Sequence, residues 1–160
     1  MAKDKEHKTN AIREMEAAGA DFEAKYFDCP EALSGVEVAR LLGQDQDRVF
    51  KTLVTAGKSG EHYVFMIPVA CELDLKKAAR AVGEKSIAMI KSRELLPLTG
   101  YIHGGCSPVG MKKLFRTTID ETAELYDRIM FSGGRIGCQI ETPLAELQRV
   151  VPVEVADLTV

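Results

Sequence analysis

The chain has 160 residues, of which 46% are hydrophobic and 28% charged, and a formal net charge of −3. This length and apolar content are typical of one domain, so we expect residues 1–160 to fold together. No run approaches the roughly 18 apolar residues that span a bilayer, and no apolar stretch follows the charged residues 1–10, so we expect a cytoplasmic protein without a membrane partner. The negative net charge argues against a surface covered with bases for DNA binding.

The four cysteines are far apart in the sequence and form no metal-binding pattern. They are Cys29, Cys71, Cys106 and Cys138. No pair has the C-x-x-C spacing, and the three histidines form no H-x-x-x-H pair, so we expect no metal site and no cofactor. Free thiols in a reducing compartment are the simplest interpretation.

The first 43 residues predict a helix, a strand and a second helix. A threonine N-cap and a glycine bound the first helix, and apolar and charged residues then alternate over 22–26 as in a half-buried strand. A turn follows, and serine and glutamate at capping-box spacing open the second helix. The residues that mark these boundaries are Thr9, Gly19, Asp28, Pro30, Ser34, Glu37 and Gly43.

Residues 49–55 and 62–69 are β-branched and aromatic runs joined by a turn with two glycines, which predicts a β-hairpin. Both runs are apolar on both faces, so we place the two strands at the centre of a sheet. Asp74 then predicts the N-cap of a helix that Gly83 ends. The side chains expected to face inward from this helix are Leu75, Ala78, Ala79 and Val82.

The second half of the chain predicts short strands between glycine-rich turns. We expect strands near 87–89, 117–120, 128–131 and 138–141, a short helix from Ser92, and a last helix with Thr142 as N-cap and Pro143 at its first position. Hairpins combined with helices of crossover length predict an α/β fold whose sheet is mixed, part antiparallel and part parallel.

Lys51 lies in the middle of a predicted strand that is apolar on both faces. Alternation places it on the same face as Val49 and Leu53. A lysine covered on both sides is costly to bury alone, so Lys51 either lines a cleft, pairs with an acid, or lies on an edge strand and reaches water. In a cleft, its ammonium group could bind a phosphate or stabilise charge on an ester oxygen.

The segment 104–110 is rich in glycine and nearly matches a phosphate-binding P-loop. Gly105 and Gly110 have the required spacing, but Met111 stands where the P-loop lysine must be, which disfavours nucleoside triphosphate hydrolysis. Two interpretations stay open: backbone N–H groups that a ligand approaches closely, and a tight turn without a ligand. Gly133 and Gly134 predict a hairpin turn with the same two interpretations.

No convincing nucleophile is found in the sequence. Cys106 follows His103 by three residues, but no acid is placed to orient the histidine, so we interpret Cys106 as a loop side chain that faces the interior. Ser132 lacks the flanking glycines of a nucleophile elbow, and we expect its hydroxyl to bind a substrate carbonyl instead.

Two clusters of basic residues are candidate phosphate contacts, although such clusters are usually solvated faces. They comprise Lys76, Lys77 and Arg80, and, after the glycine loop, Lys112, Lys113 and Arg116. Residues 141–160 hold four acids and one base, so residues 1–140 are neutral overall. A neutral body with local bases is compatible with binding the end of a nucleic acid.

Several motifs, in this order, resemble the YbaK family of Cys-tRNA(Pro) deacylases, which is related to the editing domain of bacterial prolyl-tRNA synthetases. The resemblance extends from about Thr9 to about Leu147. The motifs are residues 49–53 (VFKTL), 73–78 (LDLKKA), 99–101 (TGY), 104–113 (GGCSPVGMKK), 119–120 (ID) and 132–134 (SGG). The resemblance implies a single α/β domain with a mixed, curved sheet and surrounding helices. Such a domain edits in trans, because a synthetase pocket sized for proline cannot strongly reject cysteine.

The resemblance also implies the site. The family's lysine matches Lys51, to which it assigns catalysis. The residues assigned to substrate binding are Tyr26, Thr52, Gly104, Gly105, Ser107, Pro108, Ser132, Gly133 and Gly134. The second loop departs from the family, because Ile136 follows Arg135 where a second base is usual. Gln139 stands where family members vary between acidic and amide residues.

In the cysteine-specific members, the thiol of the substrate attacks the ester, so the resemblance implies an enzyme without a nucleophile of its own. The implied reaction is deacylation of Cys-tRNA(Pro), with Cys-tRNA(Cys) as a further substrate. The tRNA acceptor end is then the partner, and prolyl-tRNA synthetase a second one. Two alternatives stay open: a deacylase of Ala-tRNA(Pro) that uses water, and a non-catalytic module that binds tRNA or nucleotide ends.

Overall fold

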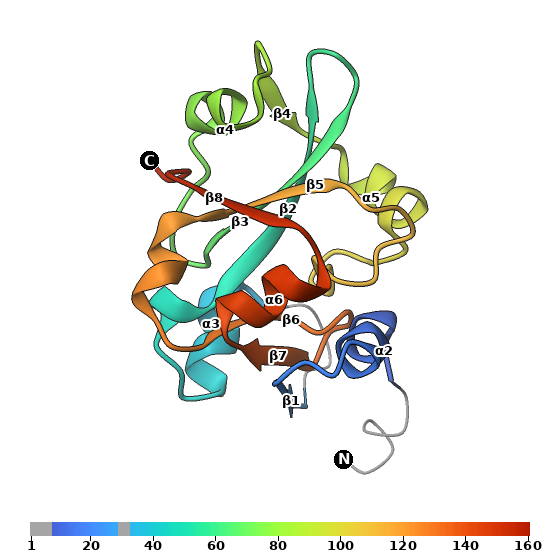
Figure 1. The fold of residues 1–160 in the computed structure, drawn as a ribbon, viewed down its shortest axis with the longest axis vertical. Coiled ribbons are helices and arrows are strands. Elements are labelled where there is room, and N and C mark those ends of the chain that lie inside the picture. The colour runs from blue at the N-terminus through green and yellow to red at the C-terminus, as the bar shows by residue number, and fades with distance from the viewer. Residues whose placement is uncertain (1–7, 29–32) are drawn as a thin grey trace.

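A five-stranded mixed sheet runs through the larger part of the fold (Figure 1). The structure is a computed structural model and describes residues 8–28 and 33–160. The strand order is β4-β2-β3-β5-β8, and β3 pairs antiparallel with β2 and parallel with β5. The strands are β2 (Phe50–Gly57), β3 (His62–Pro68), β4 (Ile87–Met89), β5 (Arg116–Asp120) and β8 (Val153–Ala156). The predicted mixed sheet with the hairpin at its centre is confirmed.

A separate antiparallel sheet of three strands lies at the lower end of Figure 1, in the order β1-β7-β6. Its strands are β1 (Glu23–Tyr26), β6 (Ile129–Ser132) and β7 (Cys138–Thr142). An isolated parallel bridge between Val49 and Met130 joins it to the start of β2. The sequence predicted these strands but not their separation into a second sheet, because strand patterns do not specify which strands pair.

Five α-helices surround the sheets in the described part of the chain. They are α2 (Asn10–Ala17), α3 (Gly35–Leu41), α4 (Leu75–Val82), α5 (Ser92–Thr99) and α6 (Leu144–Val150), with 3₁₀ turns η1 (Gln46–Arg48) and η2 (Glu121–Leu125). The predicted N-caps Thr9, Ser34 and Asp74 are confirmed, since each side chain accepts a backbone N–H of the first turn. The capping box of Ser34 and Glu37 is also confirmed.

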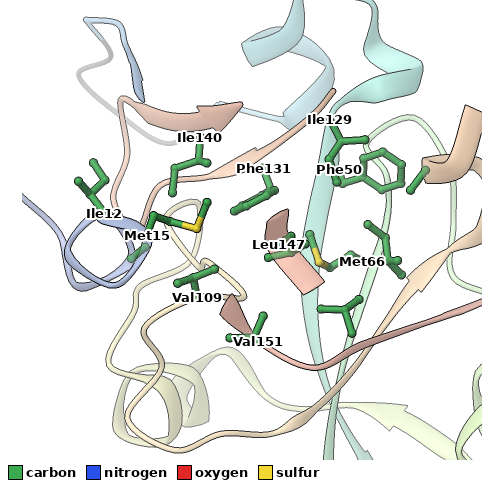
Figure 2. Packing of buried hydrophobic residues seen from close by; sticks show 14 of the residues in the cluster. Ile12, Met15, Phe50, Met66, Val109, Ile129, Phe131, Ile140, Leu147 and Val151 are labelled. Atoms are coloured by element: carbon green, nitrogen blue, oxygen red, sulfur yellow. The ribbon is translucent and has the colours of Figure 1, made fainter. Parts of the chain in front are cut away.

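The largest hydrophobic core lies between the two sheets (Figure 2). Its buried side chains come from both sheets and from α2 and α6. They include Ile12, Met15, Phe50, Met66, Phe131, Ile140 and Leu147. Burial of each such side chain stabilises the fold by about 1.5–3 kcal/mol, so the sheets are held in one relative position. This packing places Lys51 of one sheet on the wall of the same cavity as Ser132 and Gln139 of the other.

Four details of the predicted elements are wrong, were missed or fall outside the described residues. Thr142 is not a helix N-cap but the last residue of β7, where its hydroxyl donates to the carbonyl of Asp21 at 2.7 Å, and α6 begins one residue after Pro143. Leu75 does not face inward; it is 43% exposed at the start of α4. β8 was not predicted. The predicted turn residue Pro30 lies outside the described residues.

Candidate functional site

A cavity of about 500 Å³ lies along one edge of β2, a size suited to a small organic ligand. Among the described residues, its walls come from six parts of the chain: the start of α3, the strand β2, Val69 after β3, the β4–α5 region, the first glycine loop, and the facing ends of β6 and β7. The polar and catalytic candidates among the lining residues are Ser34, Lys51, Thr52, Ser92, His103, Gly104, Cys106, Ser132 and Gln139. Val38, Leu53, Val54, Met89, Ile90 and Leu95 contribute apolar wall.

The cavity exists because β4 covers only one end of β2. β4 pairs with Thr55–Gly57, and the N–H of Ile90 donates to the carbonyl of Val54 at 3.4 Å. The carbonyl of Val49 instead accepts from Val69 on the β3 side. Because backbone groups alternate along a strand, the N–H and C=O of Thr52 point away from β3 and toward the cavity.

Lys51 lies on the cavity wall, half-buried, opposite Ile67 of the central strand β3. It makes no ion pair and no hydrogen bond with any residue of 8–28 or 33–160. The sequence left three surroundings for Lys51 open: a cleft, a pairing acid, or an edge strand with access to water. The structure selects the cleft. A half-buried ammonium group without a protein partner is suited to an anionic or carbonyl ligand.

Two side-chain oxygens of the cavity wall are buried without a hydrogen-bond partner among the described residues, Thr52 Oγ1 and Gln139 Oε1. Gln139 lies directly opposite Ser132 in the β6–β7 register. The Ser132 hydroxyl accepts the N–H of Gly134 at 3.2 Å. A buried polar atom without a partner is costly, so these two oxygens are suited to hydrogen-bond donors of a ligand.

The two glycine-rich loops touch each other beside the cavity. Gly104 lines it and has φ +87°, a conformation that favours glycine. At Gly105, an added Cβ would lie 2.8 Å from the Cα of Arg135, so only glycine lets the loops approach this closely. Because of this contact, the first loop is held in place by the second.

The structure therefore divides the predicted site residues into two groups. Those that line the cavity are Lys51, Thr52, Gly104 and Ser132; those that do not line it are Tyr26, Gly105, Ser107, Pro108, Gly133 and Gly134. Ser107 is fully buried, and its hydroxyl accepts the N–H of Val109 at 3.3 Å. Pro108 contributes to a smaller cavity of about 250 Å³ elsewhere. The ring of Tyr26 lies under the guanidinium of Arg135, 5.6 Å from its centre.

Cys106 lines the cavity but is poorly suited to act as a nucleophile. Burial raises the pKa of its thiol to about 12, even though a hydrogen bond with Thr99 lowers it. The thiolate is the reactive form, so at neutral pH Cys106 is protonated. The described residues place no hydrogen bond between His103 and Cys106, and the prediction that Cys106 faces the interior is confirmed.

The sequence did not predict that the start of α3, the β4–α5 junction and Gln139 line the cavity. The capping box of Ser34 located the start of α3 without indicating what it faces. For Gln139 a signal was present: it alternates with the buried Cys138 and Ile140 on a strand that follows the second glycine turn.

Within residues 8–28 and 33–160, no three His, Cys, Asp or Glu side chains come together as a metal site. No helix of the same residues is long and apolar enough to cross a bilayer.

Comparison with known proteins identifies the family. The profile of the aminoacyl-tRNA editing domain matches residues 29–150. The chain belongs to the aminoacyl-tRNA editing family. The resemblance to YbaK-type proteins is thereby confirmed, and with it the assignment of the chain as an enzyme of the aminoacyl-tRNA deacylase class.

Individual relatives of this editing domain agree. A proposed Cys-tRNA(Pro)/Cys-tRNA(Cys) deacylase of Enterococcus faecalis, EbsC, is 42% identical over 161 aligned residues, which cover 99% of this chain and 98% of that protein. A proline–tRNA ligase of Pelobacter propionicus is 33% identical over 84 residues, 52% of this chain and 15% of the ligase. A solved structure described as a proposed trans-editing enzyme for prolyl tRNA synthetase has a TM-score of 0.84 and 26% identity, and covers 96% of this chain and 99% of that one.

Proposed function

We propose that this editing domain deacylates Cys-tRNA(Pro), with Cys-tRNA(Cys) as a further substrate, and that residues 1–160 act as one domain in the cytoplasm. The cavity beside Lys51 carries the proposal: it presents an ammonium group and two buried oxygens that have no partner among the described residues, while its lining cysteine is protonated. The identity of 42% to the Enterococcus protein over nearly the full length of both chains supports the choice of substrate.

A cysteinyl ester brings its own nucleophile, so the protein needs none. The thiol sulfur forms a bond to the ester carbonyl carbon, the bond from that carbon to the ribose oxygen breaks, and the ribose oxygen takes up the proton that the thiol gives up. The products are tRNA and a four-membered thiolactone of cysteine, which water opens to free cysteine. Holding the sulfur close to the carbonyl supplies much of the rate, because the attack is then intramolecular and oriented.

Each wall residue has a role in this proposal. Lys51 and the Thr52 N–H stabilise the negative charge that develops on the carbonyl oxygen. Gln139 Oε1 and Thr52 Oγ1 accept donors of the substrate, the ammonium group of the cysteine or a ribose hydroxyl. Gly104 and Ser132 shape the wall near the ester. Tyr26, Gly105, Ser107, Pro108, Gly133 and Gly134 act indirectly, since they hold the two loops in position.

We further propose that the domain acts in trans beside prolyl-tRNA synthetase. Support comes from the alignment with the proline–tRNA ligase, which covers half of this chain but only 15% of the ligase. That ratio is expected if the chain corresponds to an editing portion of the larger enzyme.

The proposal is tested with a panel of aminoacyl-tRNA(Pro) esters that differ in the side chain. We expect rapid loss of the cysteinyl ester, and no acceleration for seryl or S-methylcysteinyl esters, because neither offers a free thiol. Loss of Ala-tRNA(Pro) at a comparable rate would instead establish attack by water. Saturable binding of every ester without any hydrolysis would establish a non-catalytic module and refute the proposal.

A further inference from the structure

The positive charge of the chain is concentrated in one segment, residues 85–116. This segment holds six Lys and Arg residues and one acid, Glu94, whereas the rest of the chain holds 15 bases and 23 acids. The segment has a formal charge of +5 in a chain whose total is −3. It comprises β4, α5 and the first glycine loop, the parts that form one whole side of the cavity.

Most of this charge is not neutralised by the protein. Arg116 pairs with Glu154 at 2.7 Å, and the Glu94 carboxylate is occupied by the backbone N–H of Lys91 at the start of α5. The other five bases are exposed and form no ion pair with residues 8–28 or 33–160. They are Lys85, Lys91, Arg93, Lys112 and Lys113.

Three of these bases lie at the two ends of α5, whose residues Ser92 and Leu95 line the cavity. Lys91 and Arg93 alternate with Ile90 and Ser92, which line it. At the other end, the N–H of Lys112 donates to the carbonyl of Thr99 at 3.0 Å, and the Lys112 side chain packs over Gly100. A helix of eight residues is about 12 Å long, so Lys112 lies roughly one helix length from Lys91 and Arg93, which flank the cavity-lining Ser92.

The other basic cluster predicted from the sequence, on α4, differs in its position relative to the cavity. Lys77 is engaged with Asp157 at 3.0 Å and with the carbonyl of Thr159. Lys76 and Arg80 are exposed and form no ion pair within the described part of the chain, but no residue of α4 lines the cavity. Charge alone does not separate the two clusters; their position relative to the cavity does.

We infer that the α5 face, defined by Lys91, Arg93 and Lys112, binds the sugar-phosphate backbone of the tRNA acceptor end while its terminal nucleotide lies in the cavity. The inference rests on the proposed function, since it places the rest of the substrate relative to the same site. Phosphate contacts of this kind position a nucleic acid without reading its sequence. The α5 face therefore contributes affinity and orientation, and no preference for one tRNA.

Matched double variants test this face. Lys91→Ala/Arg93→Ala removes two exposed, unpaired bases beside the cavity, and Lys76→Ala/Arg80→Ala removes two of the same kind on α4. Binding of uncharged tRNA(Pro) is measured by fluorescence anisotropy across a salt series, and deacylation of Cys-tRNA(Pro) is measured in parallel. Each lost phosphate contact lowers the slope of log Kd against log salt by roughly 0.7–0.9.

For the α5 variant we expect a slope lower by about 1.4–1.8, a tRNA affinity and kcat/KM lower by roughly tenfold, and a kcat within about twofold of the parent. The α4 variant should match the parent in all of these. Equal slopes for the two variants would overturn the inference. A parent protein that binds tRNA(Pro) but leaves Cys-tRNA(Pro) intact would refute the proposed function alone, because the slopes still report on the face.

Discussion

Lys51 on β2 and Glu141 on β7 are both charged strand residues partly or largely withdrawn from water, but their surroundings are opposite. Glu141 is 8% exposed and lies 2.7 Å from Nη2 of Arg48 and 3.6 Å from Nζ of Lys25. Burial alone would raise its pKa, but the hydrogen bond and charge of Arg48, with Lys25 and Arg128, outweigh burial and hold the pKa below its usual value. Lys51 has no such partner in the described residues.

We propose that this difference separates a structural charge from one that contacts a ligand. Arg48 also donates to the carbonyl of Arg128 at 3.0 Å. Arg48 of η1 is thereby bonded both to Glu141 of β7 and to the residue before β6, which attaches η1 to the small sheet. The fold satisfies that charge completely. At Lys51 the same fold leaves a cation on the wall of a cavity, without a partner among the described residues, and we propose that a substrate completes its surroundings.

The largest effect on activity is expected for Lys51→Met, which removes the cation from the cavity wall. We expect kcat/KM for Cys-tRNA(Pro) to fall by about 100-fold, because a charge that stabilises the developing oxyanion is lost. The free energy of unfolding should stay within about 0.5 kcal/mol of the parent or rise, since Lys51 has no hydrogen bond or ion pair with the described residues to lose. Steady-state kinetics and urea unfolding measure both. Lys25→Met is the control, a strand lysine engaged by Glu23 and Glu141, and it should keep its activity.

The converse change is Glu141→Gln. Removing the carboxylate leaves the half-buried Arg48 without a charge partner among the described residues. We expect about 2 kcal/mol of destabilisation in urea unfolding. Below the new melting temperature, kcat/KM should stay within about threefold of the parent. A variant as stable as the parent would show that the cluster of Arg48, Lys25 and Glu141 is not structural.

The stabilisation by Glu141 should depend on pH. Its folded-state pKa lies below its unfolded value of about 4.3, so the contribution is complete above that pH and is lost as pH falls through the lower folded-state pKa. The difference in Tm between the parent and Glu141→Gln should therefore be constant from about pH 6 to 8 and shrink toward about pH 3. A difference that persists at the acid end would contradict the assigned cause.

A smaller effect is expected for Gln139→Leu. If Gln139 Oε1 accepts a donor of the substrate, kcat/KM should fall by about tenfold, while stability is unchanged or increased because an unpartnered buried oxygen is removed. Gln148→Leu is the matched control, since the amide of Gln148 donates to the carbonyl of Val153 at 3.1 Å. That control should lose stability and retain activity. The reverse pattern would remove Gln139 from the site.

The smallest effect is expected for Cys106→Ala. Because the Cys106 thiol is protonated at neutral pH, activity on Cys-tRNA(Pro) should stay within about twofold of the parent. Loss of more than about 100-fold with the fold intact by circular dichroism would make Cys106 a nucleophile and end the proposal of a substrate thiol.

Local features of the sequence predicted most elements and the central place of β2 and β3. N-caps and capping boxes depend on residues three positions apart, and strand alternation depends on neighbours two apart, so a short window contains the whole signal. Gly104 and the turn at Gly133 were predicted as special backbone positions for the same reason. Lys51 was conspicuous because its charge conflicts with the apolar pattern around it.

Tertiary structure alone decided what those features do. The pairing of β4 with β2 ends at Thr55 and leaves the rest of that edge of β2 open. The small sheet brings Gln139 to the same cavity as Lys51, and Glu154 pairs with Arg116, whereas Lys91 has no ion pair among the described residues. All three arrangements depend on segments far apart in the chain. Thr142 was misread as an N-cap because a partner 121 positions away, Asp21, competes for its hydroxyl. A sequence specifies which local conformations are favourable, but only tertiary packing decides which residues far apart in the chain come into contact. The candidate site consists of residues brought together in this way.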